Sequence, residues 1–214
     1  RLFFIDGPAG TGKTYTYNYI VSEILSAGAN VRTAAWTGIA ATLLQKGVTV
    51  HNLFRLPVPI LETSTGNVSP VSSYAETLRN CDLFLLDEAS MIPVHAFHAI
   101  DRLLRDVCSN DIPFGGKVIL IGGDFRQVLP VVKKGKPAQI IEACLKSSPL
   151  WYLVKKFNLT HNMRARAEEI QFSDWLLELG NGTLPKRQGP PYVEAIEIPE
   201  QCTVHEASIV STMY

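Results

Sequence analysis

The chain has few cysteines, no long apolar run and no excess of charge of either sign. Its 214 residues include four cysteines, which lie far apart and form no Cys-x-x-Cys pair. That spacing disfavours a disulfide framework or a zinc site and fits reduced thiols in an intracellular protein. No apolar run approaches the roughly 18 residues of a membrane span, and no signal-peptide pattern stands at the start. The sequence therefore predicts a globular domain without a membrane partner.

Charge gives little direct information about partners. Lysine plus arginine equal aspartate plus glutamate, at 20 residues each, so the net charge does not indicate nucleic acid. Basic residues nevertheless gather in residues 117–166 and acidic residues in 82–116. The basic stretch fits a nucleic-acid contact and ordinary solvated faces equally well. Hydrophobic residues make up 46% of the chain, which suffices for one sizeable core.

The most informative segment is a glycine-rich octapeptide near the start. It reads Gly7-Pro8-Ala9-Gly10-Thr11-Gly12-Lys13-Thr14 and fits the P-loop pattern G-x-x-x-x-G-K-[ST]. In such a loop, backbone N–H groups cradle phosphate oxygens, the lysine reaches the β- and γ-phosphates, and the Ser/Thr hydroxyl ligates Mg²⁺. Residues 1–6 predict a buried strand, and residues 15–27 predict a helix whose N-terminus faces the phosphates. The segment predicts a nucleotide site, with an ordinary glycine-rich turn as the weaker alternative.

Strand-like and helix-like segments alternate along the rest of the chain. Apolar runs predict strands at 31–36, 82–87, 117–122 and 156–160, and helices are predicted at 38–45, 93–108, 137–146 and 167–179. This order is typical of an α/β fold, a mostly parallel sheet with helices on both faces. Residues 55–79 carry no helical period and predict an irregular insertion with at most a short hairpin. The chain opens directly on a core strand, so we expect a piece of a longer protein.

Three polar groups follow predicted strands, where ligands of parallel sheets bind. Asp87-Glu88 ends the strand 82–87 in the arrangement called Walker B, in which the aspartate holds Mg²⁺ opposite Thr14 and the glutamate polarises the attacking water. Gln127 follows the strand 117–122 and is placed to sense the γ-phosphate. Arg164 follows the strand 156–160 and could stabilise charge in phosphoryl transfer. From the residues alone, a surface arginine is an equal alternative.

Two threonine-containing turns suit a nucleic-acid backbone. Thr37-Gly38 follows the second strand at the start of a helix, and Thr49-Val50-His51 stands at a boundary between a helix and a loop. Hydroxyl and free N–H groups in such places bind phosphates. For each turn alone, helix capping by the threonine and packing of the histidine are the stronger interpretations.

Six motifs in this order resemble the superfamily 1B DNA helicases of the petite-integration-frequency (Pif) type. They are G-P-A-G-T-G-K-T, T-G-I-A-A, T-V-H-N-L-F, L-L-D-E-A-S-M-I, G-G-D-F-R-Q-V-L-P-V and L-T-H-N-M-R. The stretch F-G-G-K-V-I-L-I-G-G-D-F-R-Q is most similar to the Helitron-like eukaryotic branch. The resemblance implies a RecA-like P-loop NTPase fold, with residues 1–184 as the first motor domain. It also implies that residues 55–79 are a small wedge insertion and that 185–214 are a linker towards a second RecA-like domain.

The same resemblance implies an ATP-dependent enzyme that moves 5′ to 3′ on single-stranded DNA and unwinds duplex or forked DNA. ATP and Mg²⁺ would be held by the octapeptide 7–14 and by Asp87, and the DNA would be contacted by Thr37, Gly38 and His51. The catalytic residues would be Lys13, Glu88, Gln127 and Arg164. DNA repair, recombination, telomere maintenance or transposition would be its setting, in the nucleus or alternatively the mitochondrion.

Two alternatives to a helicase stay open at this level. One is a P-loop NTPase that does not unwind DNA, and the other is an inactive relic derived from a transposon. The family's adenine-reading motif and second motor domain are not within the sequence, so we expect this segment alone to bind and hydrolyse ATP weakly.

Overall fold

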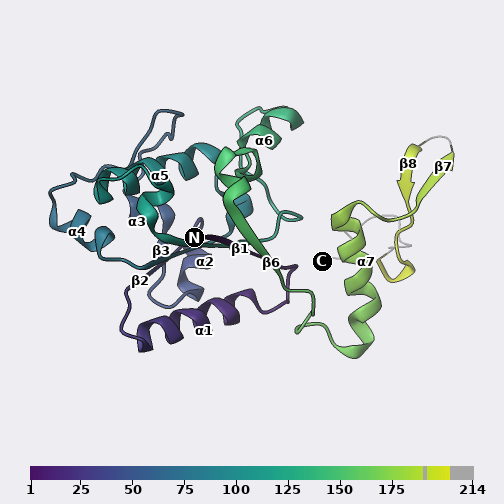
Figure 1. The fold of residues 1–214 in the computed structure, drawn as a ribbon. Coiled ribbons are helices and arrows are strands. Elements are labelled where there is room, and N and C mark those ends of the chain that lie inside the picture. Colours follow the sequence, from purple (N-terminus) through teal and green to yellow (C-terminus); the bar gives the residue numbers. More distant parts are fainter. Residues whose placement is uncertain (190–191, 203–214) are drawn as a thin grey trace, which may run out of the picture. The chain divides into compact units, whose positions relative to one another are not determined.

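The structure is a computed structural model that describes residues 1–189 and 192–202. It divides the chain into two compact units, Arg1–Ala165 and Arg166–Tyr214. Figure 1 shows the first unit as a sheet flanked by helices and the second as a helix followed by a pair of strands. No helix among the described residues is both long enough and apolar enough to cross a membrane.

Six parallel strands form the sheet of the first unit. They are β1 (Leu2–Asp6), β2 (Val31–Ala35), β3 (Val48–Thr49), β4 (Leu83–Asp87), β5 (Val118–Gly123) and β6 (Val154–Asn158). Their order is β3-β2-β4-β5-β1-β6, and every neighbouring pair runs parallel. The predicted α/β fold with a parallel sheet is confirmed.

Helices cover both faces of this sheet (Figure 1). One hydrophobic cluster joins α1 (Lys13–Ser26) and α2 (Gly38–Leu43) to the sheet, and the other joins α3 (Val50–Phe54), α4 (Ser73–Arg79) and α5 (Val94–Cys108). Successive side chains of a strand point to opposite faces, so Phe84 packs in one cluster and Leu85 in the other. This double burial explains why the strands read as continuous apolar runs.

The segment 55–79 differs from its prediction. No hairpin forms there; instead its end folds into α4, and Ser72 caps this helix by accepting a hydrogen bond from Ala75 N–H at 3.1 Å. Ala75 and Leu78, three residues apart, are both buried. The apolar face spans only two turns, which explains why no helical period is visible in the sequence. Whether the segment acts as a wedge stays a prediction.

The predicted helix 137–146 is shorter than expected. Helix α6 (Pro137–Ala143) ends three residues early, and a 3₁₀ turn at Leu145–Ser147 follows it. The buried side chain in this turn is Leu145, which belongs to the main hydrophobic cluster. Packing of this residue therefore accompanies the change from α-helix to the tighter turn.

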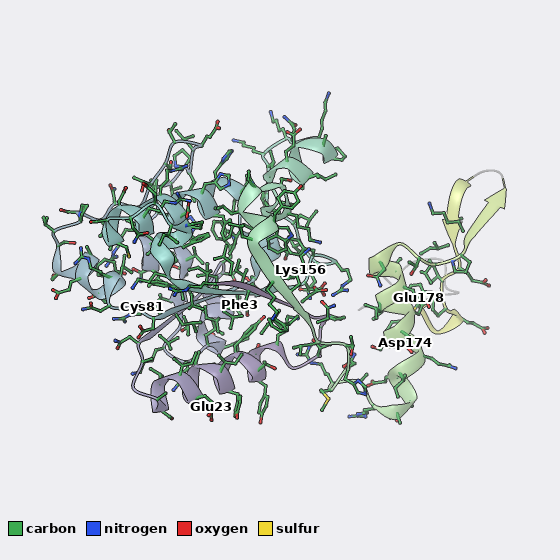
Figure 2. All side chains as sticks on the ribbon, in the orientation of Figure 1. Phe3, Glu23, Cys81, Lys156, Asp174 and Glu178 are labelled. Carbon is green, nitrogen blue, oxygen red and sulfur yellow. The ribbon has the colours of Figure 1, made fainter. Side chains whose placement is uncertain are left out.

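The second unit contains α7 (Ile170–Asn181), β7 (Lys186–Gly189) and β8 (Tyr192–Ile196). The two strands pair antiparallel, within the stretch that the sequence predicts as a linker. Asp174 and Glu178, which lie one turn apart on α7, are labelled in Figure 2, and this helix has no buried residue. Residues 203–214 of the predicted linker lie outside the described part of the chain, and the domain boundary after residue 184 stays a prediction.

Candidate nucleotide-binding site

The carboxyl ends of four strands bring the predicted site segments to one edge of the sheet. The register places Asp6 of β1 opposite Gly123 of β5, and Ala35 of β2 opposite Asp87 of β4. Strands in parallel pairs end at the same edge, so the loops that follow them are neighbours. The octapeptide, the Asp87-Glu88 pair, the Gln127 loop and Thr37 therefore lie at the edge where such sheets bind ligands.

The glycine-rich loop joins β1 to α1, and its shape depends on left-handed glycines. Gly10 has a φ of 83° and Gly12 a φ of 81°, a conformation that glycine adopts without steric cost. A Cβ on Gly10 would lie 2.5 Å from Asn162 Oδ1 and 3.0 Å from Arg164 Cβ. Met163 N–H also donates to the Gly10 carbonyl at 2.8 Å. The turn that carries Arg164 therefore packs directly on the loop, as the arginine's predicted role requires.

Lys13 is held by the loop itself. Its Nζ donates to the carbonyl oxygens of Gly7 at 2.6 Å and Pro8 at 3.1 Å. Burial lowers the pKa of Lys13, and the negative charges of nearby aspartates, Asp124 foremost, oppose that shift. An entering phosphate would compete with the loop carbonyls for this ammonium group. The cation is thus already present where the P-loop pattern predicts it.

Asp87 provides a buried carboxylate at the end of β4. Its Oδ1 accepts a hydrogen bond from Glu88 N–H at 2.8 Å. Burial raises the pKa of Asp87, because a charged carboxylate loses hydration there. Carboxylate and hydroxyl oxygens are ligands that Mg²⁺ accepts, so Asp87 and Thr14 have the donor chemistry of the predicted magnesium site.

Tyr17 of α1 lies close enough to Asp87 to feel its charge. Its side chain is fully buried, and its hydroxyl makes no hydrogen bond of good geometry with any residue that the structure describes. Burial raises the pKa of Tyr17 well above its ordinary value, and the negative charge of Asp87 adds to this effect. The phenol therefore stays neutral beside the carboxylate. Nothing in the spacing of the motifs indicates this neighbour.

An ion-pair network that the motifs do not indicate lies beside Lys13. The Nε atom of Arg126 pairs with Asp124 Oδ1 at 2.6 Å, and its Nη2 pairs with Asp6 Oδ1 at 3.3 Å. Asp124 is buried, so Arg126 offsets the cost of an ionised carboxylate there. Asp124 and Arg126 lie in the same motif as Gln127, so the sequence could have indicated their pairing. The pairing of Arg126 with Asp6 joins residues 120 positions apart, and no local pattern predicts it.

Gln127, the predicted sensor, is exposed at the same edge. Its Nε2 donates to Asp124 Oδ2 at 3.1 Å, and its backbone N–H donates to the Asp124 carbonyl at 3.1 Å. The buried aspartate thereby orients the amide. The structure places Gln127 beside the residues that surround Lys13, and its sensing role stays a prediction.

Thr37 contacts the Walker B glutamate. Thr37 Oγ1 donates to Glu88 Oε2 at 2.8 Å. Glu88 has a φ of 58°, in the left-handed region that non-glycine residues rarely adopt. The residue predicted to activate water is therefore joined to a residue predicted to bind nucleic acid.

The other predicted nucleic-acid residues show the structural roles that the sequence left open. Thr37 caps α2, of which Gly38 is the first residue, and Thr49 caps α3. The His51 ring packs on Trp36 with centroids 4.6 Å apart, and burial lowers the pKa of His51. These roles do not exclude phosphate contacts, so binding of DNA by Thr37, Gly38 and His51 stays a prediction.

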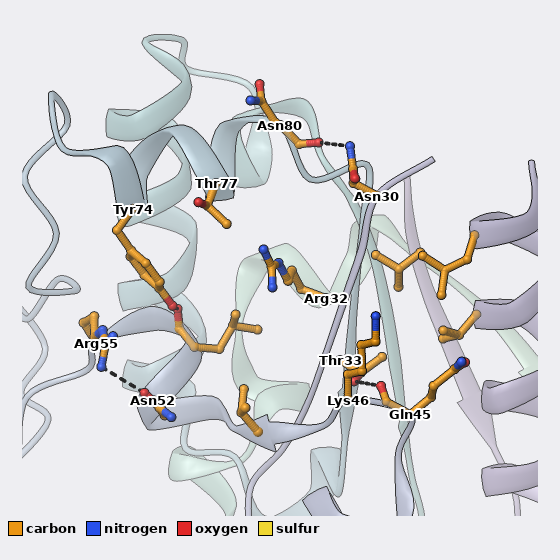
Figure 3. A pocket seen from close by; sticks show the side chains of 15 residues that line it. Asn30, Arg32, Thr33, Gln45, Lys46, Asn52, Arg55, Tyr74, Thr77 and Asn80 are labelled. Carbon is orange, nitrogen blue, oxygen red and sulfur yellow. Dashed lines mark hydrogen bonds between the residues drawn. The ribbon is translucent and has the colours of Figure 1, made fainter. Parts of the chain in front are cut away.

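A cavity of about 620 Å³ lies elsewhere, lined by residues of β2, by Lys46 and by residues of α4. Figure 3 shows Arg32 at its centre, with Lys46 and Tyr74 around it. None of its lining residues is a carboxylate, and none comes from the octapeptide, the Asp87-Glu88 pair or the Gln127 loop. This cavity is therefore distinct from the candidate nucleotide site.

Comparison with known proteins agrees with the motif order. The model of the PIF1-like helicase family matches residues 1–190. The chain is 33% identical over 135 residues to the ATP-dependent DNA helicase Pif1 of Psychrobacter, covering 62% of this chain and 20% of that protein. It is 32% identical over 137 residues to human PIF1, covering 63% of this chain and 21% of the human protein. The chain thus spans about a fifth of the length of these relatives.

Solved structures show the same fold. A crystal structure of Bacteroides Pif1 bound to single-stranded DNA superposes with a TM-score of 0.72 at 31% identity, over 86% of this chain and 43% of that one. Bacteroides Pif1 in complex with ADP-AlF3 and single-stranded DNA superposes with a TM-score of 0.73 at 31% identity, with the same coverage. The parallel sheet, the P-loop and the Walker B pair thus lie in a RecA-like domain, and the chain belongs to the PIF1-like helicase family.

Proposed function

We propose that this chain contributes the first motor domain of an ATP-dependent DNA helicase. The observation that carries the proposal is the convergence of Lys13, Asp87 and the Gln127 loop at one edge of a RecA-like sheet. Because the chain spans only part of its relatives, a second RecA-like domain of the same parent protein would complete the ATP site. Hydrolysis by this segment alone is expected to be weak.

ATP and Mg²⁺, when bound, would supply the phosphoryl group and the metal charge. The loop 7–14 has the backbone and the ammonium group that hold phosphates, and Thr14 and Asp87 have the oxygen ligands that hold Mg²⁺. Glu88 would accept a proton from the water that attacks the γ-phosphate, and Gln127 would hydrogen-bond the γ-phosphate or that water. Arg164, whose turn packs on Gly10, neutralises charge that develops during transfer.

Single-stranded and forked DNA are the proposed nucleic-acid partners. One similar structure is of Bacteroides Pif1 bound to single-stranded DNA, and another concerns DNA unwinding at forked double-stranded DNA by two coordinating Pif1 helicases. In this chain, Thr37, Gly38 and His51 are the proposed DNA contacts. We propose translocation from 5′ to 3′, which rests on the family resemblance.

We propose that the parent protein acts in DNA metabolism. DNA repair, recombination, telomere maintenance and transposition all fit a Pif1-type motor, and the nucleus is the proposed location with the mitochondrion as the alternative. A non-unwinding NTPase shares Lys13 and Asp87 but has no need of Thr37, His51 and Gln127 together. An inactive relic would not be expected to retain Lys13, Glu88, Gln127 and Arg164.

Steady-state ATP hydrolysis by the parent protein tests the proposal. Rates are measured with and without single-stranded DNA, beside the variant Lys13→Ala. Strong stimulation by DNA that is lost in the variant supports a DNA motor and leads to a directional unwinding assay. Hydrolysis that is indifferent to DNA favours the non-unwinding NTPase, and no hydrolysis by a folded protein favours the relic.

A further inference from the structure

The hydrogen bond between Thr37 and Glu88 joins two loops with different proposed partners. Thr37 Oγ1 lies 2.8 Å from Glu88 Oε2. The contact is built into the sheet, because Ala35 of β2 pairs with Asp87 of β4 and Trp36 N–H donates to the Asp87 carbonyl at 3.3 Å. The loop proposed to bind DNA and the loop proposed to activate water are thereby held side by side.

The hydroxyl of Thr37 has one proton to donate. Its oxygen accepts a hydrogen bond from Ala40 N–H at 3.3 Å as the cap of α2, and its proton is directed to Glu88. A hydroxyl carries one proton and two acceptor lone pairs. A phosphate oxygen of DNA can only accept, so it would need that same proton. Thr37 can therefore donate to Glu88 or to a phosphate, but not to both.

The bond also determines where the Glu88 carboxylate lies. In the sheet order, β4 lies between β2 and β5, and β1, which leads into the P-loop, lies beyond β5. Donation from Thr37 therefore draws the carboxylate towards β2, on the side away from the P-loop. It also occupies one of the two oxygens that could take a proton from water. The left-handed backbone of Glu88, with a φ of 58°, is unfavourable for a glutamate, so contacts such as this one must maintain it.

We propose that Thr37 is a positioning residue that restrains Glu88 until a nucleic-acid phosphate takes the Thr37 proton. Binding of DNA then frees the carboxylate to turn towards the water beside the nucleotide. The inference rests on the proposed function and adds to it a direct route by which DNA accelerates hydrolysis. This route follows from the positions of the Thr37 and Glu88 side chains and from the single proton of the Thr37 hydroxyl. It needs no conformational change elsewhere in the domain.

The first test is DNA-free ATP hydrolysis by the parent protein and its Thr37→Val variant. Valine has a similar shape but no proton to donate, so Glu88 is released without DNA. We expect the DNA-free kcat to rise about fivefold or more, the lower end of typical couplings between sites, while the KM for ATP stays unchanged. The DNA-free rate is the decisive reading because weakened DNA binding would itself reduce stimulation.

Two control variants separate the hydrogen bond from the helix cap. Thr37→Ser keeps the hydroxyl, so its DNA-free rate is expected to stay below that of Thr37→Val. Ser72→Ala removes the equivalent cap from α4, whose hydroxyl accepts from Ala75 N–H at 3.1 Å, and is expected to retain the wild-type rate. A Thr37→Val rate equal to or below that of the wild type overturns the proposal.

The second test is reciprocal and involves no hydrolysis. If Glu88 competes with DNA for the Thr37 proton, Glu88→Ala should tighten single-stranded DNA binding by about fivefold or more, the lower end of typical couplings between sites. The affinity is measured with a labelled oligo-dT in the absence of nucleotide. In a Thr37→Val background, Glu88→Ala should have only the smaller effect of removing one negative charge. Equal tightening in both backgrounds would contradict competition.

The outcomes distinguish this inference from the proposed function. DNA-stimulated hydrolysis by the wild type, together with an unchanged DNA-free rate in Thr37→Val, overturns the restraint and leaves the DNA motor intact. A wild type that DNA does not stimulate overturns the motor and the release by DNA together, even if Thr37→Val hydrolyses ATP faster.

Discussion

Replacement of Gly122 by alanine should destabilise the first unit measurably. Gly122 lies in β5, and a Cβ at this position would lie 2.9 Å from Tyr17 Cε1 and closer still to Cζ and Oη. The Tyr17 side chain is 0% exposed, so its ring has no free space into which it can turn. Insertion of an extra methyl group into a packed core costs about 1–3 kcal/mol. Because both contacting groups are rigid, we expect the upper part of that range.

Thermal and urea denaturation of the whole chain would measure this effect. A domain of this size loses about 2–4 °C of melting temperature per kcal/mol, so a fall of roughly 4–12 °C corresponds to a loss of about 2–3 kcal/mol. Gly38→Ala is the matched control, because nothing lies within 4 Å of the Cβ that it would add. The control is expected to match or slightly exceed the wild-type midpoint, because alanine restricts the unfolded chain more than glycine does.

A double-mutant cycle assigns the loss to one contact. Tyr17→Leu shortens the side chain, so Gly122→Ala in that background should cost much less than in the wild type. Contacting residues show coupling energies of about 0.5–3 kcal/mol. Gly122→Ala with the stability of Gly38→Ala, or a cycle without coupling, would refute the argument that Gly122 exists to accommodate Tyr17.

Three further substitutions test the electrostatics and the backbone of the site. Burial raises the pKa of Asp87, so its ionisation costs stability as pH rises from the ordinary aspartate value through the raised one. Asp87→Asn should therefore be more stable than the wild type at about pH 8, with the gain shrinking towards about pH 4. Urea denaturation in the presence of EDTA measures the free energy of unfolding at each pH. A gain in stability that grows on acidification would contradict the raised pKa. Arg126→Met leaves the Asp124 charge buried without its guanidinium partner and should lower the free energy of unfolding by about 2–3 kcal/mol. This is less than the ~3–5 kcal/mol of a fully buried pair because Arg126 is partly exposed. An unchanged urea midpoint would show that the ion pair does not stabilise the fold. Gly10→Ala forces alanine into a φ of 83° beside Asn162 and should lower the free energy of unfolding by about 1–2 kcal/mol. It should also raise the KM for ATP of the parent protein. An unaltered KM in ATPase assays would count against close packing of the loop.

The sheet and the principal site residues could be predicted from local patterns. Residues 83–87 are all buried, since helices cover both faces of the sheet, and that burial produces the continuous apolar run that predicts β4. The P-loop pattern places Lys13 at the start of a helix, and Asp87 follows from the end of a strand. These features depend on consecutive residues, so the sequence displays them directly.

Short elements could not be predicted in the same way. Strand β3 has two residues and α3 has five, which is too few for a period to emerge. Helix α4 has seven residues and follows a segment rich in proline and serine that suggests a loop. Such elements form because their neighbours offer a surface to pack against, and that surface is visible only after folding.

The sequence by itself determined the family, the fold class and the positions of the residues proposed to handle phosphate, because each is written in a contiguous motif with a known local geometry. Tertiary structure alone decided which of those residues touch. The Thr37–Glu88 hydrogen bond joins positions 51 residues apart, and the pair of Arg126 with Asp6 joins positions 120 apart. Such contacts arise from the order of the strands and their register, since a parallel sheet brings together loops that are distant in the chain.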